Sequence, residues 1–123
     1  MKKIFFTLIF LTSACLFSQE IDFKKGIVYI DGKECLKYDS EANNVSFQDL
    51  NGNDIMVLKF IRDYGDLYTE VIFFETKEKF SSRSYIFTKK ALIEKLVKSN
   101  TLSNCTLNAD KVKIFVQKYN ERI

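Results

Sequence analysis

Residues 55–75 read IMVLKFIRDYGDLYTEVIFFE, two apolar runs joined by a short polar turn. Both runs carry large side chains at odd and even positions alike, whereas successive side chains of a strand point to opposite faces of a sheet. This pattern predicts two strands that are covered on both faces or lie at the centre of a sheet. The turn at residues 62–66 is short enough for a hairpin, and Gly65 is free to adopt a positive φ.

Turn signals predict further strands on both sides of this central hairpin. Asp31-Gly32 matches the type I′ turn, in which both central residues have positive φ. Asn51-Gly52 is a second hairpin signal between apolar runs. Residues 19–25 are predicted to be a polar lead-in without a strand. The six predicted strands cover residues 27–30, 34–38, 45–50, 55–61, 67–74 and 83–88.

Two helices are predicted after the last strand, because the apolar period changes there from two to about three and a half residues. The first covers residues 89–98, with Thr88 as its N-terminal cap, and the second begins after Asn108 and runs to about residue 121. The buried stripe of the second helix is predicted to consist of Val112, Phe115, Val116 and Tyr119.

Six strands joined by short turns and followed by two helices predict one α+β domain over residues 19–123. The expected fold is an antiparallel six-stranded meander sheet with the two C-terminal helices packed on one face. A small curled β-barrel with C-terminal helices is the alternative, because six short aromatic-rich strands can close around a small interior. The chain contains no proline and no Gly/Ser-rich linker that would divide it.

The first eighteen residues are typical of a secretory signal peptide. Lys2 and Lys3 precede an apolar segment at residues 4–11, and small or polar residues follow it. The apolar segment is shorter than the roughly 20 residues that span a bilayer. We therefore expect residues 1–18 to be removed on export, and the mature domain to act in the periplasm or outside the cell.

Cys15 offers an alternative to simple cleavage. Residues 12–15, TSAC, resemble a bacterial lipobox with threonine where leucine is usual. Two apolar residues follow the cysteine directly, where lipoproteins normally have a polar tether. Cleavage after Ser18 or Ala14 is therefore preferred, and contact with a membrane is expected only if Cys15 is lipidated.

Cys35 and Cys105 remain in the mature domain and can form one disulfide in an oxidising compartment. The bond would close a loop of about 70 residues, and two separate buried thiols are the alternative. Strict alternation puts Cys35 on the face opposite Leu36 and Tyr38. The bond therefore requires this strand to be covered on both faces or to lie at an edge of the sheet.

Charge and composition exclude several functions. Two of the 19 basic residues leave with the signal peptide, so 17 remain against 16 acidic ones, and this balance does not favour nucleic acid as a partner. The chain has no histidine, which rules out Ser-His-Asp and Cys-His arrangements. Two cysteines alone cannot build a structural zinc site. No nucleotide-binding glycine pattern is present, and no cofactor is predicted.

Carboxylates are the remaining candidates for chemistry. A pair of turn aspartates could act as general acid and base, although local turn hydrogen bonding explains them better. Residues 49–54, DLNGND, are rich in oxygen ligands but lack the EF-hand spacing, so an ordinary turn is preferred to a calcium site. Lysines on the helices could form a basic face, which acidic residues dilute. The aspartates in question are Asp31, Asp49, Asp54, Asp63 and Asp66.

Tyrosines on the predicted strands are candidates for a recognition surface, since exposed tyrosines are effective binding anchors. They are also ordinary strand formers that pack across strands. The candidates are Tyr29, Tyr38, Tyr68 and Tyr85. Together with export and the missing catalytic groups, they predict a non-catalytic binding or interaction module with a protein or glycan partner outside the cytoplasm. A carboxylate-based hydrolase and a lipid-anchored structural envelope protein are the alternatives.

Overall fold

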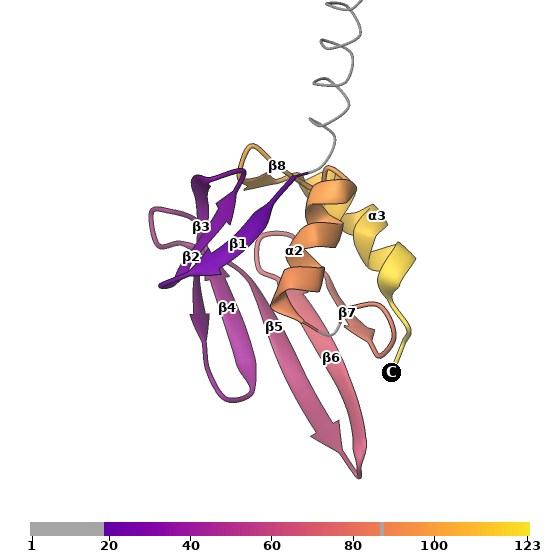
Figure 1. Cartoon of the computed structure of the whole chain (residues 1–123). Coiled ribbons are helices and arrows are strands. Elements are labelled where there is room, and N and C mark those ends of the chain that lie inside the picture. Colours follow the sequence, from indigo (N-terminus) through magenta and orange to yellow (C-terminus); the bar gives the residue numbers. More distant parts are fainter. Residues whose placement is uncertain (1–18, 87) are drawn as a thin grey trace, which may run out of the picture.

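The computed structural model describes residues 19–86 and 88–123. The predicted signal peptide, with Cys15, lies outside the described residues. Figure 1 shows a twisted sheet with two helices on one side of it. The strands are β1 (Ile21–Lys24), β2 (Ile27–Ile30), β3 (Lys33–Ser40), β4 (Asn44–Gln48), β5 (Asp54–Asp63), β6 (Asp66–Phe73) and β7 (Lys79–Ser82). All neighbours are antiparallel and follow one another in sequence order.

Helices and a small ribbon complete the chain after β7. They are α2 (Lys89–Lys98), the two-stranded ribbon of β8 (Leu102–Ser103) and β9 (Thr106–Leu107), and α3 (Ala109–Tyr119). Both predicted caps are confirmed, because the side chain of Thr88 accepts a hydrogen bond from Ala91 N and that of Asn108 accepts one from Lys111 N. Within the described ranges, no helix is long and apolar enough to cross a membrane.

The predicted meander with two C-terminal helices is confirmed, with seven strands in place of six. The barrel alternative is wrong, since β1 and β7 are the two open edges of the sheet. The predicted lead-in contains the edge strand β1, in which buried Ile21 and half-buried Phe23 alternate with polar residues. An edge strand that buries only every second side chain resembles a polar loop in sequence.

The last strand lies earlier than predicted. β7 ends at Ser82, whose hydroxyl accepts hydrogen bonds from the backbone N–H groups of Tyr85 and Ile86. These bonds turn the chain away from β6, so that residues 83–86 do not continue the sheet. Buried Thr69 on β6 donates its hydroxyl to the carbonyl oxygens of Ser82 and Ile86 and holds the turn in place.

Two-residue turns with positive φ at both central residues close four hairpins. The predicted Asp31-Gly32 turn is confirmed, with φ of 53° and 79°. Tyr64-Gly65 closes the central hairpin between Asp63 and Asp66. The β1–β2 and β8–β9 turns, Lys25-Gly26 and Asn104-Cys105, have the same signs of φ. Their backbone twist matches that of the strands they join.

The hydrophobic core lies between the sheet and the two helices. Phe115 of α3 packs edge-on against Phe73 and Phe80, with ring centroids 6.3 and 5.7 Å apart. The predicted stripe of α3 is confirmed, because Val112, Phe115 and Val116 are buried and Tyr119 is half-buried against the core. On α2 the buried residues are Leu92, Ile93 and Leu96.

A β-bulge at Cys35 breaks the alternation of β3. Val28 pairs with Leu36 and Tyr29 pairs with Glu34, so Cys35 is an extra residue without a cross-strand partner. Cys35 and Leu36 are adjacent in sequence, and both are buried in the same core. The prediction that they point to opposite faces is therefore wrong, since strict alternation does not hold across a bulge.

A second bulge places Ile55 on the helix-covered side. Phe47 pairs with Met56 and Gln48 pairs with Asp54, which leaves Ile55 without a partner on β4. Ile55 packs against the same core as buried Met56. Residues 55–58 are apolar at odd and even positions alike partly because the bulge inserts Ile55. Burial of both faces of the strand is not the whole reason.

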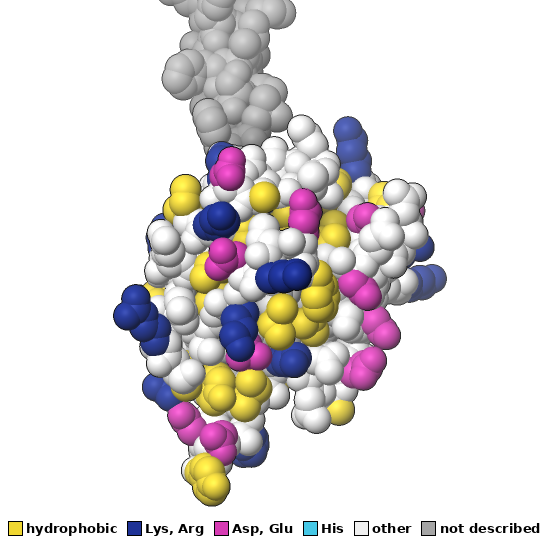
Figure 2. Space-filling view, turned by 180° about the vertical axis from the view of Figure 1, so that it is seen from behind, with side chains coloured by type: hydrophobic (Ala, Val, Ile, Leu, Met, Phe, Trp, Pro, Cys, Tyr) yellow, Lys and Arg dark blue, Asp and Glu magenta, His cyan; other side chains and the backbone are white. Residues whose placement is uncertain are grey.

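The helix-free face of the sheet carries its own small apolar group. Val57 lies opposite Ile72, and Ile61 lies opposite Tyr68. Val57 is only 8% exposed although it does not belong to the main core. Figure 2, which views the molecule from behind, shows apolar side chains in small groups separated by lysines and acidic residues.

Candidate functional site

A cavity of about 270 Å³ lies where the β4–β5 turn, the end of β6 and the β8–β9 ribbon meet the start of α3. We call it the α3 cavity. Its apolar wall consists of Ile55, Phe73, Leu107 and Val112. Phe73 and Val112 are each 1% exposed, whereas Ile55 and Leu107 are half-buried. The bulge in β5 supplies Ile55, so a local irregularity of the sheet helps to build the cavity.

Three carboxylates line the same cavity. Asp49 and Asp54 come from the two ends of the β4–β5 turn, and Glu75 follows β6. Within the part of the chain that the structure describes, no lysine or arginine lines it. None of the three acids forms an ion pair within residues 19–86 and 88–123. The arrangement combines an apolar wall with a negative rim, which favours a group that is positively charged and partly apolar.

Asp49 also organises the turn on which it lies. Its carboxylate accepts hydrogen bonds from the backbone N–H groups of Asn51 and Asn53, both at 2.9 Å, and from the Asn53 side-chain amide at 3.0 Å. These bonds, that of the Asn53 amide first, hold the pKa of Asp49 below its ordinary value. Asp49 is therefore ionised near neutral pH and poorly suited to donate a proton.

The calcium interpretation of residues 49–54 gains no support from this geometry. The Asp49 oxygens face groups of their own turn that donate hydrogen bonds. Asp49, Asp54 and Glu75 line one cavity, but among the residues that the structure describes no three His, Cys, Asp or Glu side chains are placed so that they could hold one metal ion. The preferred interpretation of an ordinary turn agrees with the contacts.

A disulfide joins Cys35 to Cys105, with Cα atoms 5.1 Å apart. It ties β3 to the turn of the β8–β9 ribbon, and Cys105 forms part of the wall of the α3 cavity. A smaller cavity of about 200 Å³ is lined by both cysteines. The disulfide is compatible with an oxidising location outside the cytoplasm.

The five turn aspartates are only partly brought together. Asp49 and Asp54 share the α3 cavity. Asp31 lies at the β2–β3 turn and accepts a hydrogen bond from Glu20 N. Asp63 and Asp66 flank the tip of the central hairpin, where Asp66 pairs with Arg83. Sequence reasoning did not find Glu75, which follows a buried strand without any recognisable motif.

The four candidate tyrosines do not form one surface. Tyr29 and Tyr68 are half-buried on β2 and β6, strands that lie far apart in the sheet order. Tyr38 packs edge-on against Phe23, with ring centroids 5.1 Å apart, and against the core. Tyr85 lies in the segment after β7, where it is 51% exposed.

Several helix lysines lie over aromatic rings. Lys89 Nζ is 4.8 Å from the ring centroid of Tyr38 and 5.3 Å from that of Phe23. Lys95 and Lys118 lie over Tyr119, each at 5.4 Å. These contacts give three of the lysines a local packing role.

Comparison with known proteins gives no relative for this chain, because no family model, curated protein or solved structure matches it.

Proposed function

We propose that this chain is a small exported binding protein without catalytic activity, and that its α3 cavity holds a ligand combining an amine cation with an apolar group. The observation that carries the proposal is the cavity itself, which has an apolar wall and three carboxylates, with no basic side chain among the described residues that line it. The pattern of residues 1–18 supports export, and so does the disulfide.

The size of the cavity limits the ligand. Binding sites for drug-sized molecules usually enclose roughly 300–1,000 Å³, so about 270 Å³ suits one ring or a short alkyl chain. The apolar part would cover Phe73 and Val112, and the ammonium group would lie between Asp54 and Glu75 at the exposed rim. A lysine beside an apolar residue in a partner peptide has the same chemistry.

The start of α3 opposes a cation only weakly. A helix N-terminus carries a partial positive charge. Here Asn108 caps it and Asp110 lies in the first turn, which offsets that charge. The carboxylates therefore dominate the potential at the rim.

The alternative of a carboxylate-based hydrolase receives one favourable observation, the shared position of Asp49 and Asp54. Such an enzyme needs one carboxyl group that stays protonated near neutral pH to act as the acid. The lowered pKa of Asp49 works against that role. Binding is the function that the geometry supports better.

A matched pair of probes tests the proposal on the mature domain, residues 19–123. 2-Phenylethylamine and 2-phenylethanol differ in the cationic group and have nearly the same size. We expect the amine to bind at least about tenfold more tightly in an NMR titration, with shifts at Ile55, Phe73 and Leu107. Equal affinities, or shifts confined to other residues, would overturn it.

Variants of the rim carboxylates test whether these residues cause the preference for the amine. Asp54→Asn and Glu75→Gln should each weaken amine binding by about two- to fivefold, as expected for exposed ion pairs. The affinity for 2-phenylethanol should not change. Glu94→Gln, an exposed substitution on α2, is the control. A loss equal to that of the rim variants would contradict the assignment.

A further inference from the structure

The open edge of β7 is occupied by the end of the same chain. After α3 the C-terminal segment runs along β7 (Figure 1). Glu121 N donates to the carbonyl oxygen of Ser81 at 2.8 Å, and Ser81 N donates to Asn120 Oδ1 at 3.2 Å. The segment thus satisfies an outward-facing donor and acceptor of the edge strand, as an added strand would.

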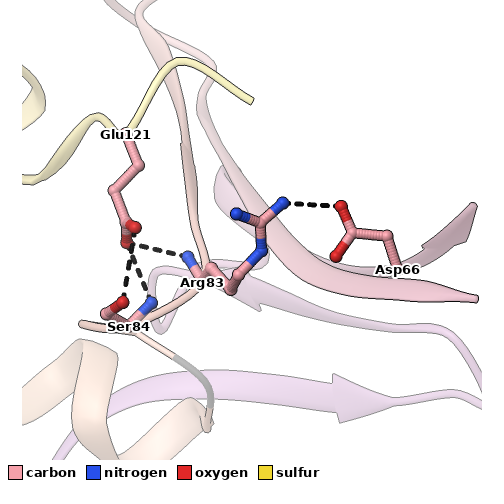
Figure 3. Close-up of polar contacts among 4 residues, drawn as sticks. All are labelled: Asp66, Arg83, Ser84 and Glu121. Carbon is pink, nitrogen blue, oxygen red and sulfur yellow. Dashed lines mark hydrogen bonds and ion pairs between the residues drawn. The ribbon is translucent and has the colours of Figure 1, made fainter.

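The side chain of Glu121 occupies an anion site beside this edge. Its Oε1 atom accepts hydrogen bonds from Arg83 N at 2.8 Å, Ser84 N at 2.9 Å and Ser82 Oγ at 3.1 Å. The Oε2 atom accepts a weaker bond from Ser84 Oγ at 3.4 Å. Figure 3 shows the two backbone N–H groups converging on the carboxylate. Successive N–H groups that point to one place form a typical anion-binding concavity.

This site recognises the carboxylate through backbone N–H groups and two serine hydroxyls, and not through a basic side chain. The guanidinium group of Arg83 points to Asp66 on the central hairpin instead (Figure 3). The geometry therefore depends on the turn at residues 82–84, which Thr69 and Ser82 hold in place.

Two residues make the hydrogen bonds that hold the C-terminal segment on β7. Beyond Tyr119 it forms neither helix nor strand, and Arg122 and Ile123 are exposed. Asn120 and Glu121 make the hydrogen bonds to β7 and its turn, and both side chains are half-buried. A competing segment would have to replace these six hydrogen bonds.

We propose that the edge of β7 together with residues 82–84 is a docking site for an extended segment of another protein that presents a glutamate side chain. The chain's own residues 120–121 occupy this site until such a segment displaces them. Backbone bonds to Ser81 would provide part of the affinity, and the N–H groups of Arg83 and Ser84 would select a glutamate. The site is separate from the α3 cavity, and its test is independent of it.

The experiment uses the mature domain with Glu121→Ala, which removes the resident carboxylate. The probe is the acetylated and amidated peptide QKYNERI, which corresponds to residues 117–123. We expect saturable shifts of the backbone amides of Arg83 and Ser84 on titration. The wild-type domain should bind the peptide at least about fivefold more weakly, because its own tail competes at an effective concentration in the millimolar range.

Two controls separate this site from unspecific binding. A peptide with glutamine in place of its glutamate should not shift the Arg83 and Ser84 amides. The variant Glu94→Ala, on the exposed side of α2, should behave as the wild type. If Glu121→Ala fails to fold, Glu121→Gln, which preserves the size of the side chain, takes its place.

Several results would overturn the proposal. They are unchanged Arg83 and Ser84 amides at millimolar peptide, equal binding of both peptides, or equal binding by variant and wild type. Arg83 and Ser84 shifts that grow with wild-type protein concentration, together with dimer formation, would identify the occupant as the tail of a second copy. That result would also overturn the assignment to a separate partner.

Discussion

Two acidic residues each organise a short backbone segment. Asp49 accepts hydrogen bonds within the β4–β5 turn, and Glu121 accepts them from the turn after β7. Hydrogen bonds to the charged form lower the pKa in both cases. The Asn53 amide contributes most at Asp49, and the Ser84 backbone N–H contributes most at Glu121. The stability of both segments should therefore depend on pH, because these hydrogen bonds require ionised carboxylates.

The direction in which stability changes with pH is a testable prediction. A carboxyl group with a folded-state pKa below its unfolded value stabilises the protein above the unfolded pKa, and the stabilisation is lost as the pH falls through the folded pKa. We expect the urea midpoint to fall below about pH 5. Asp49→Asn and Glu121→Gln should each make this fall shallower. An unchanged pH profile in both variants would contradict the prediction, with Glu94→Gln as the matched control.

At the scale of elements, α3 shows how one face of a helix determines its position. Its buried residues recur at helical spacing and contact β6 and β7 through Phe73 and Phe80. The neighbouring Ile114 is 64% exposed. Substitutions at Phe115 and at Ile114 can therefore distinguish the loss of a buried side chain from a general effect on helix formation.

Phe115→Ala should lower the free energy of unfolding by about 3–5 kcal/mol, the usual cost of removing a buried aromatic side chain. Phe115 is 2% exposed and packs against two other core rings. Ile114→Ala should change it by less than about 0.5 kcal/mol. Urea unfolding measures both. A loss below about 1 kcal/mol for Phe115→Ala would mean that α3 is peripheral to the core.

Most elements were predictable from local patterns, because their signals lie within a few residues. Asp31-Gly32 marks its hairpin directly, and Thr88 and Asn108 mark the helix starts. β1 was missed because Asp22 and Lys24 alternate with its buried residues. Lys25-Gly26 is also a less typical turn than Asn-Gly. The shift of the last strand depends on the hydroxyl of Ser82, and no periodicity reveals that contact.

The candidate site was less predictable, because it depends on the two bulges. Strict alternation would place Cys35 and Ile55 on the face of the sheet without helices. The two bulges insert these residues, and both pack in or against the core on the helix-covered side instead. A pair of adjacent apolar residues near a turn, such as Ile55-Met56, is the available signal, but a strand covered on both faces gives the same pattern. Glu75 and Leu107 join the cavity only through tertiary contacts.

At the scale of the whole molecule, the disulfide connects the N-terminal strands to the C-terminal part of the chain. Cys35 and Cys105 are 70 residues apart in sequence. Cys35 is inserted by a bulge of β3, and Cys105 lies at the tip of the β8–β9 ribbon. One bond therefore restrains the sheet, the ribbon and the start of α3 together.

Denatured, unreduced mature protein from its native compartment should contain no free thiols. Reduction should lower the melting temperature, because a loop of this length adds roughly 4 kcal/mol of stability in the chain-entropy model. Thiol titration and thermal unfolding with and without a dithiol reductant measure these two effects. Two free thiols in the isolated protein would show that the cysteines are ordinary core residues in that compartment.

Export also predicts the mass of the mature protein. Protein recovered from the native host should lack Met1 to at least Ala14, as removal of a signal peptide requires. Intact-mass analysis shows the cleavage site directly. Bulk protein that retains Met1 would exclude export, whereas a mass that includes acyl chains on Cys15 would favour the lipid-anchored alternative.

The sequential order of the strands also determines how this chain can fold. Every strand of the main sheet pairs with its neighbour in sequence, so each hairpin can form locally while the chain emerges with its N-terminus first. All seven strands precede Cys105. The sheet can therefore be complete, with Cys35 already in place, before the second thiol arrives. If the signal peptide is cleaved after Ser18, two cysteines remain, and no mispaired disulfide can then form within one mature domain and delay its folding.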